Sequence, residues 1–143
     1  MAEVLRTFLE ELSRQRFDWS ERNCFTVCAD WVKLVTGRDP AARWRHVKSQ
    51  AEARRVVRRA GGEIVLVERA MTAFGAQTTA EPRCGDVALV TAPRSRRGDR
   101  VIYRPTGAIC VDGTKYAILT VDLGLVVWPL PVVRAWRVEW APR

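Results

Sequence analysis

The sequence predicts an α+β fold in which N-terminal helices pack on a C-terminal antiparallel sheet or partial barrel. Up to about residue 74, apolar residues recur mainly at helical spacing. From residue 87 onward, short apolar runs alternate with turn signals, which is typical of strands. Helices followed by a strand meander indicate segregated layers. The length of 143 residues and the 48% hydrophobic content predict a single domain, 1–143, with a substantial core.

Four helices are expected in the first half of the chain, after which the pattern changes. They span residues 3–15, about 23–36, about 49–60 and about 63–74. Gly37 is a typical C-terminal cap for the second helix, and Ser49 with Glu52 forms a capping-box pattern at the start of the third. A polar loop is expected over residues 17–23.

Six strands are expected in the second half, joined by turns and one long loop. They span residues 87–91, 101–103, 108–111, 115–121, 125–128 and 135–140. The dipeptide Asp112-Gly113 predicts a hairpin, and residues 93–100 read as a basic loop. Trp136 and Trp140 share one side of the last predicted strand, where they would cover the sheet or anchor a neighbouring subunit.

Cys24 is the candidate nucleophile, because it stands at the predicted start of the second helix. The positive end of a helix dipole lowers the pKa of a thiol there and favours the reactive thiolate. A cysteine nucleophile also needs a base within hydrogen-bonding reach. The competing interpretation is a small residue buried on the apolar face that Cys24 shares with Val27, Cys28, Trp31 and Val35.

The chain resembles a family of small phage proteins that are usually encoded among tail genes. The resemblance rests on short pieces along nearly the whole chain: Phe17-Asp18-Trp19, Asn23-Cys24, Ala29-Asp30-Trp31-Val32, Thr36-Gly37-Arg38-Asp39-Pro40, Ala51-Glu52-Ala53, Gly61-Gly62, Gly85-Asp86-Val87 and Ala135-Trp136-Arg137-Val138. That family is in turn similar to the NlpC-type cysteine peptidases, which have a papain-like fold and cleave cell-wall peptides.

This resemblance implies a papain-like fold with an incomplete site. Cys24 matches the nucleophile, Asn23 replaces the usual aspartate before it, and Gly85-Asp86-Val87 matches the following strand. The strand that should begin with the catalytic histidine matches residues 106–113, and its base position falls at Thr106. Threonine cannot accept a proton from a thiol near neutral pH, so the resemblance implies a degenerate site, as in a pseudoenzyme.

His46 is the one histidine of the chain and the alternative candidate for the base. It lies in Arg43-Trp44-Arg45-His46, between two predicted helices and far in sequence from residue 106. A lone histidine in such a loop is more often a surface or packing residue. If His46 served as the base, Asp86 or Asp112 could assist it by charge or orientation.

The four cysteines also allow a metal hypothesis. Cys24 and Cys28 are one helical turn apart, and Cys84 and Cys110 flank or lie in strands, so four thiolates could hold zinc or an iron–sulfur cluster. The spacing is atypical, however, and no Cys-x-x-Cys pair occurs. We therefore expect neither a metal nor a cofactor.

The net charge of +8 permits binding to nucleic acid but does not predict it. Only three of the 24 basic residues are lysines, a skew typical of codon bias in a GC-rich genome. Arginine pairs at 54–55 and 58–59 share a helix face, which is usually a solvated surface. They could also contact phosphate or an acidic protein partner.

The sequence and the resemblance together predict a structural or docking protein of the phage tail, made in the host cytoplasm and carried in the virion. Its expected partners are other tail proteins and, as a further candidate, peptidoglycan. The alternatives are an active cell-wall cysteine peptidase or amidase, and a basic nucleic-acid-binding module. We expect no transmembrane helix and no secretory signal, because no long apolar run occurs.

Overall fold

The computed structural model describes residues 1–18 and 22–139, and within them four α-helices precede five strands. The helical elements are α1 (Ala2–Ser13), α2 (Cys24–Thr36), the short 3-10 helix η1 (Ala42–Trp44), α3 (Gln50–Ala60) and α4 (Glu63–Phe74). The strands are β1 (Val87–Arg97), β2 (Arg100–Cys110), β3 (Tyr116–Thr120), β4 (Gly124–Trp128) and β5 (Val132–Trp136). The predicted α+β class, with helices preceding an antiparallel sheet, is confirmed.

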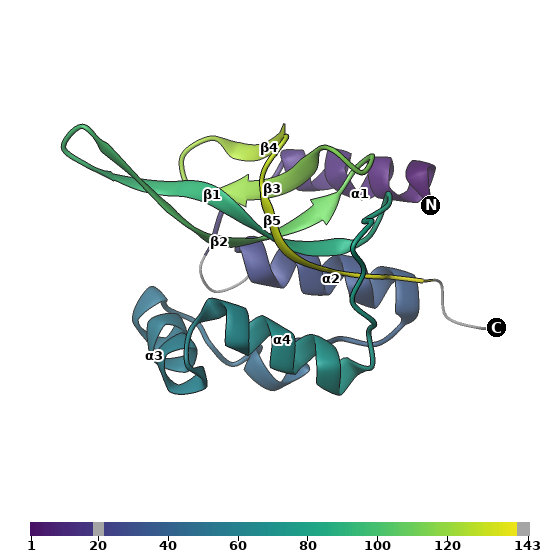
Figure 1. The fold of residues 1–143 in the computed structure, drawn as a ribbon, viewed down its shortest axis with the longest axis horizontal. Coiled ribbons are helices and arrows are strands. Elements are labelled where there is room, and N and C mark those ends of the chain that lie inside the picture. The colour runs from purple at the N-terminus through teal and green to yellow at the C-terminus, as the bar shows by residue number, and fades with distance from the viewer. Residues whose placement is uncertain (19–21, 140–143) are drawn as a thin grey trace.

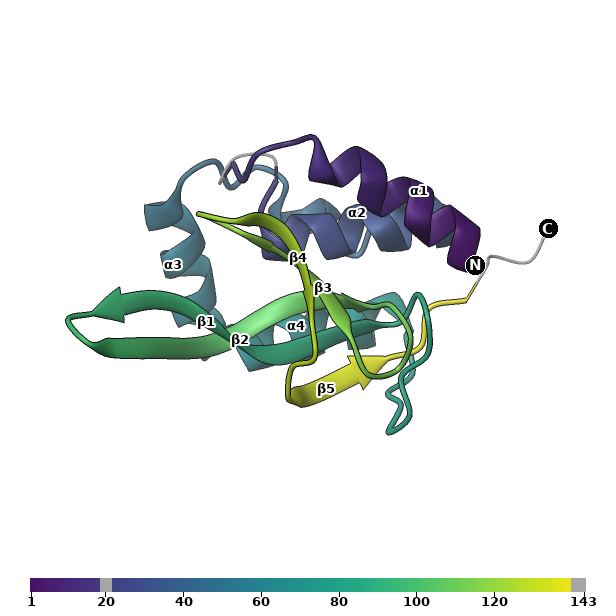
Figure 2. The ribbon, with the colours of Figure 1, turned by 90° about the horizontal axis from the view of Figure 1, so that it is seen from above.

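The strands form one antiparallel sheet in the order β4-β3-β2-β1-β5. Helix α2 runs between this sheet and the pair formed by α3 and α4 (Figure 1). Helix α1 packs beside α2, where the rings of Phe8 and Trp31 are 5.4 Å apart (Figure 2). None of the described helices has the length and apolar character needed to cross a bilayer.

Local sequence explains where α2 begins and ends. The Asn23 side chain accepts hydrogen bonds from the backbone N–H groups of Phe25 and Thr26, each at 3.0 Å. The Thr26 hydroxyl accepts one from the Asn23 N–H at 2.8 Å, which completes a reciprocal capping box. Gly37 ends the helix in the left-handed conformation, as predicted, with φ of 79°.

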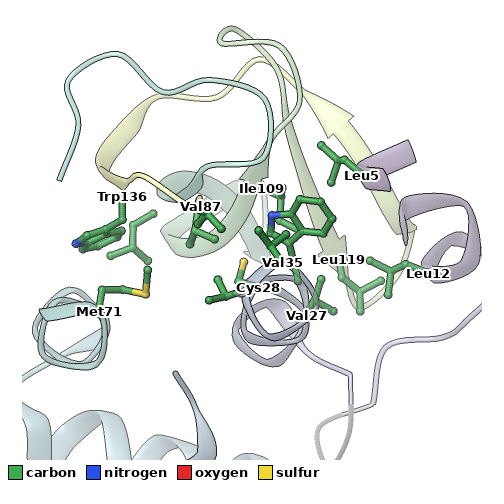
Figure 3. Packing of buried hydrophobic residues seen from close by; sticks show 14 residues of the cluster. Leu5, Leu12, Val27, Cys28, Val35, Met71, Val87, Ile109, Leu119 and Trp136 are labelled. Carbon is green, nitrogen blue, oxygen red and sulfur yellow. The ribbon is translucent and has the colours of Figure 1, made fainter. Parts of the chain in front are cut away.

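The two faces of the sheet carry different cores. On the helix side, Val87, Leu89 and Ile109 pack with apolar residues of α1, α2 and α4 (Figure 3). On the opposite face, small residues such as Ala88 and Ala108 pack with larger ones from β3 and β4. Because side chains alternate along a strand, neighbouring residues of β1 and β2 belong to different cores.

The predicted loop over residues 93–100 is wrong, as is the separation of strands 101–103 and 108–111. Strands β1 and β2 are each 11 residues long and continue as a two-stranded ribbon to the turn at Gly98-Asp99 (Figure 2). The described side chains near the tip of the ribbon are largely exposed, so its strands lack the apolar alternation that identifies half-buried strands.

The last strand is also shifted from its predicted place, to residues 132–136 instead of 135–140. Pro131 precedes the strand, and its carbonyl accepts a hydrogen bond from the Thr91 N–H. Trp136 is buried on the helix side, which agrees with the covering role predicted for it. Trp140 lies outside the described residues.

A buried hydrogen bond ties α2 to the start of β1. The Trp31 indole N–H donates to the Gly85 carbonyl at 2.7 Å, and Trp31 has no solvent exposure. Gly85 has φ of 92°, and a side chain at this position would meet Met1 Sδ at 2.8 Å. Only glycine therefore fits here without strain.

The substitution Trp31→Phe should destabilise the fold by about 1–3 kcal/mol, because it leaves the Gly85 carbonyl without its partner in a dry site. Urea denaturation followed by circular dichroism measures the effect. Trp44→Phe is the matched control, since Trp44 is only half-buried and donates no indole hydrogen bond to a described residue. Equal losses in the two variants would contradict the importance of the Trp31 bond.

Candidate functional site

Cys24 is the first residue of α2, as predicted, but it is buried. Only 4% of its surface is exposed. The Asn23 side chain occupies the helix end and takes up the backbone N–H groups of Phe25 and Thr26. A nucleophile must meet its substrate, so burial of the thiol argues for packing at this position.

Helix α2 approaches β2 closely at Gly107. A Cβ atom on Gly107 would lie 2.7 Å from the Cys24 carbonyl oxygen and 3.2 Å from Cys28 Sγ. Real side chains do not tolerate the first of these distances, so the residue facing the start of α2 must be glycine unless the helix moves away. The strand therefore presents backbone to Cys24 at this point.

Thr106, the expected base position, faces away from α2. It pairs across the sheet with Val90, which belongs to the core on the far face, whereas Gly107 pairs with Leu89 of the helix-side core. Paired residues of an antiparallel sheet share a face. The Thr106 hydroxyl donates to the Arg104 carbonyl at 3.1 Å. Cys24 and Thr106 are therefore close in the fold but lie on different faces of β2.

His46 lies in an exposed position after η1. The loop around it is held by Arg45, which pairs with Asp39 at 2.9 Å and with Asp30 at 2.7 Å. Burial opposes ionisation of Asp39, but the hydrogen bonds from Arg45 and from the Ala41 N–H prevail and lower the pKa of its carboxyl group. These contacts fix the loop without burying the imidazole.

The four cysteines form no disulfide in the described part of the chain and lie in two pairs, Cys24 with Cys28 and Cys84 with Cys110. Burial raises the pKa of the Cys28 thiol, and the nearby Cys24 and Asp30 raise it further. Burial likewise raises the pKa of the Cys110 thiol, and the nearby Cys84 raises it as well. The Cys110 sulfur accepts a hydrogen bond from the Gly113 N–H, which acts in the opposite direction. Among residues 1–18 and 22–139, no three His, Cys, Asp or Glu side chains are grouped so as to hold a metal ion.

Asp86 is a buried carboxylate whose hydrogen bonds go to the backbone. Its two oxygens accept hydrogen bonds from the backbone N–H groups of Arg83 at 2.8 Å and Val138 at 3.0 Å. The Arg137 guanidinium lies 3.2 Å from the first of these oxygens and balances the charge. The Gly-Asp pair thus joins the start of β1 to the segment after β5.

Asp112, the other carboxylate considered as an assistant to a base, holds the turn between β2 and β3. One of its oxygens accepts hydrogen bonds from Thr114 and Lys115, which lower the pKa of this exposed carboxyl group. These contacts stabilise the turn at Asp112-Gly113, which agrees with the predicted hairpin.

The structure also contains a cavity that the sequence analysis did not identify. Its volume is about 840 Å³, and it is lined by α2, the α3–α4 pair, and the β1–β2 ribbon. Cys28 and Gly107 line it, whereas Cys24, Thr106 and His46 do not. Sequence patterns could not reveal this cavity, since it forms between elements that are distant in the chain.

These features define a small α+β protein with buried cysteines on its central helix and a large cavity beside that helix. The chain belongs to the family described as domain of unknown function (DUF6950), whose profile matches residues 1–138. Neither the curated proteins nor the solved structures gave a match to the chain.

The geometry predicts the order in which the thiols react with iodoacetamide at neutral pH. Cys84, which is half-exposed, should react first. The buried Cys24, Cys28 and Cys110 should react as fast as an exposed thiol only after unfolding. For Cys28, a raised pKa also means less thiolate at a given pH. Peptide mapping by mass spectrometry at several times and pH values measures each rate. Modification of Cys24 ahead of Cys84 would instead reveal an accessible, activated thiol.

Proposed function

We propose that this protein is a structural or docking component of a phage tail, built on a papain-like, NlpC-type fold with a degenerate cysteine site. The proposal extends the resemblance carried by Asn23-Cys24, Gly85-Asp86-Val87 and residues 106–113. In this proposal the protein resides in the virion and binds other tail proteins. The resemblance to cell-wall peptidases makes peptidoglycan a further candidate ligand.

The burial of Cys24 carries the proposal. A cysteine with only 4% of its surface exposed is poorly placed to attack a polymeric substrate. The strand residue that faces the start of α2 is Gly107, which has no side chain to accept a proton. The residue aligned with the usual base is Thr106, which packs on the other face of the sheet. A buried cysteine that faces a glycine is better suited to packing than to turnover, so the proposed role of the fold is binding.

The docking role predicts that the protein is a stoichiometric part of the tail. Particles of a phage that encodes this chain are purified and separated into tails and capsids, and quantitative mass spectrometry measures the chain in each fraction. We expect a fixed number of copies per tail. Absence from purified tails, with abundant protein in the lysate, would contradict the role.

A second assay separates the docking role from an active peptidase. Purified protein is incubated with soluble peptidoglycan fragments beside a Cys24→Ala control, and the products are resolved by mass spectrometry. We expect no difference between the two proteins. Cleavage of a peptide cross-link that disappears in Cys24→Ala would establish a working hydrolase and overturn the degenerate site.

A further inference from the structure

The cavity beside α2 has an apolar wall that the fold itself leaves incompletely covered. No residue of α3 is buried, and Met71 is the one buried residue of α4. Val57 of α3 with Leu66 and Val67 of α4 line the cavity and remain half-buried. A volume of about 840 Å³ falls within the range of ligand-binding clefts, roughly 300–1,000 Å³.

The charged side chains around this cavity are nearly all of one sign. Five arginines line it against a single acidic residue, Glu63, although the whole chain has 24 basic and 16 acidic residues. Arg45 is neutralised by Asp30 and Asp39. The remaining four have no ion-pair partner within the described part of the chain; they are Arg54, Arg58, Arg97 and Arg104.

These arginines stand on two elements that enclose the cavity. Arg54 and Arg58 are one turn apart on α3, so they share one face of that helix. Arg97 and Arg104 belong to the two strands of the ribbon. Positive charge is therefore spread along the cavity and does not converge on one point, as it would for a single anionic headgroup.

From this combination we propose that the cavity is the docking groove for an acidic amphipathic helix of a partner protein. The apolar side of that helix packs against Val57, Leu66 and Val67, and its acidic side chains meet the free arginines. Helix α3 has 11 residues and is about 16 Å long. A partner helix that lies alongside α3 can contact the groove over about this length.

The inference rests on the docking role proposed above and names the surface that serves it. The two can fail separately. If the protein is present in tails but the groove binds no acidic helix, the docking surface lies elsewhere. If the groove binds such a helix but tails lack the protein, the partner belongs to another assembly.

The test uses the full chain and a fluorescein-labelled synthetic peptide of about 14 residues. The peptide carries leucine at positions i, i+3, i+4 and i+7 and glutamate at the remaining ones. Fluorescence anisotropy measures its dissociation constant, which we expect in the micromolar range and weakening as salt is added. A peptide with lysine in place of glutamate should not bind.

Helix α3 provides a matched pair of variants. Arg54→Glu/Arg58→Glu reverses two charges that line the groove, whereas Arg55→Glu/Arg59→Glu reverses two that do not. All four side chains are exposed, so both variants should fold like the wild type. We expect the first to weaken peptide binding by about tenfold or more and the second by less than about threefold.

Three outcomes would overturn the inference. The first is absence of binding at low salt up to about 1 mM peptide. The second is equal loss of affinity in the two α3 variants, which would indicate a general charge effect. The third is that a random-sequence DNA duplex binds with dependence on Arg54 and Arg58 while the acidic peptide does not, which would identify the groove as a nucleic-acid site.

Discussion

The hydrogen bonds around Gly85 and Asp86 position everything else in this fold. The Gly85 carbonyl accepts from the Trp31 indole of α2, and the Gly85 N–H donates to the Cys110 carbonyl at the end of β2. The Asp86 carboxylate then holds the backbone of Val138, after β5. A buried polar group left without a partner costs about 1–3 kcal/mol, so the loss of any one of these bonds destabilises the fold. They bring together α2, β1, β2 and the segment that follows β5.

Fixing α2 in this way determines what Cys24 can do. Once Trp31 is anchored, the preceding turns of the helix lie against β2, and Gly107 allows the backbones to approach. The same approach buries Cys24 and Cys28, and burial raises the pKa of the Cys28 thiol. The close packing that buries these two cysteines also keeps a substrate away from their thiols. The geometry favours packing, since a reactive cysteine needs to be accessible to its substrate.

Much of the fold was predictable because its signals are local. Capping at Asn23 and Gly37 and the apolar periodicity of α2 act within a few residues, and the helices follow the sequence closely. The ribbon of β1 and β2 was missed because its exposed strands, joined at Gly98-Asp99, carry no apolar alternation. It is held together by backbone pairing, which side-chain patterns do not report.

The candidate site was harder to predict than the fold, because it depends on strand faces. Residues 106–110, in the segment expected to carry the base, do lie in β2, beside α2. One residue of register nevertheless decides which face a side chain occupies, and Thr106 and Gly107 illustrate the difference. The sequence also identified Asp86 as part of the matched strand start, but its hydrogen bonds to Arg83 and Val138 could be found only in three dimensions.

The distribution of burial over the molecule argues for a binding role independently of the thiol. Most buried residues of the helix-side core come from the sheet, α1 and α2, whereas the α3–α4 pair contributes one fully buried residue, Met71, and partly buried ones such as Val67 and Phe74. The pair also makes contacts at the surface, such as the ion pair of Glu68 with Arg134 and the stacking of Arg38 on Phe74. Elements with so little buried surface open at low cost in free energy. A ligand that fills the cavity would bury the apolar sides of α3 and α4, which contributes about 25 cal/mol of binding free energy per Å² of apolar surface. Binding of the ligand would therefore also complete the packing of these two helices.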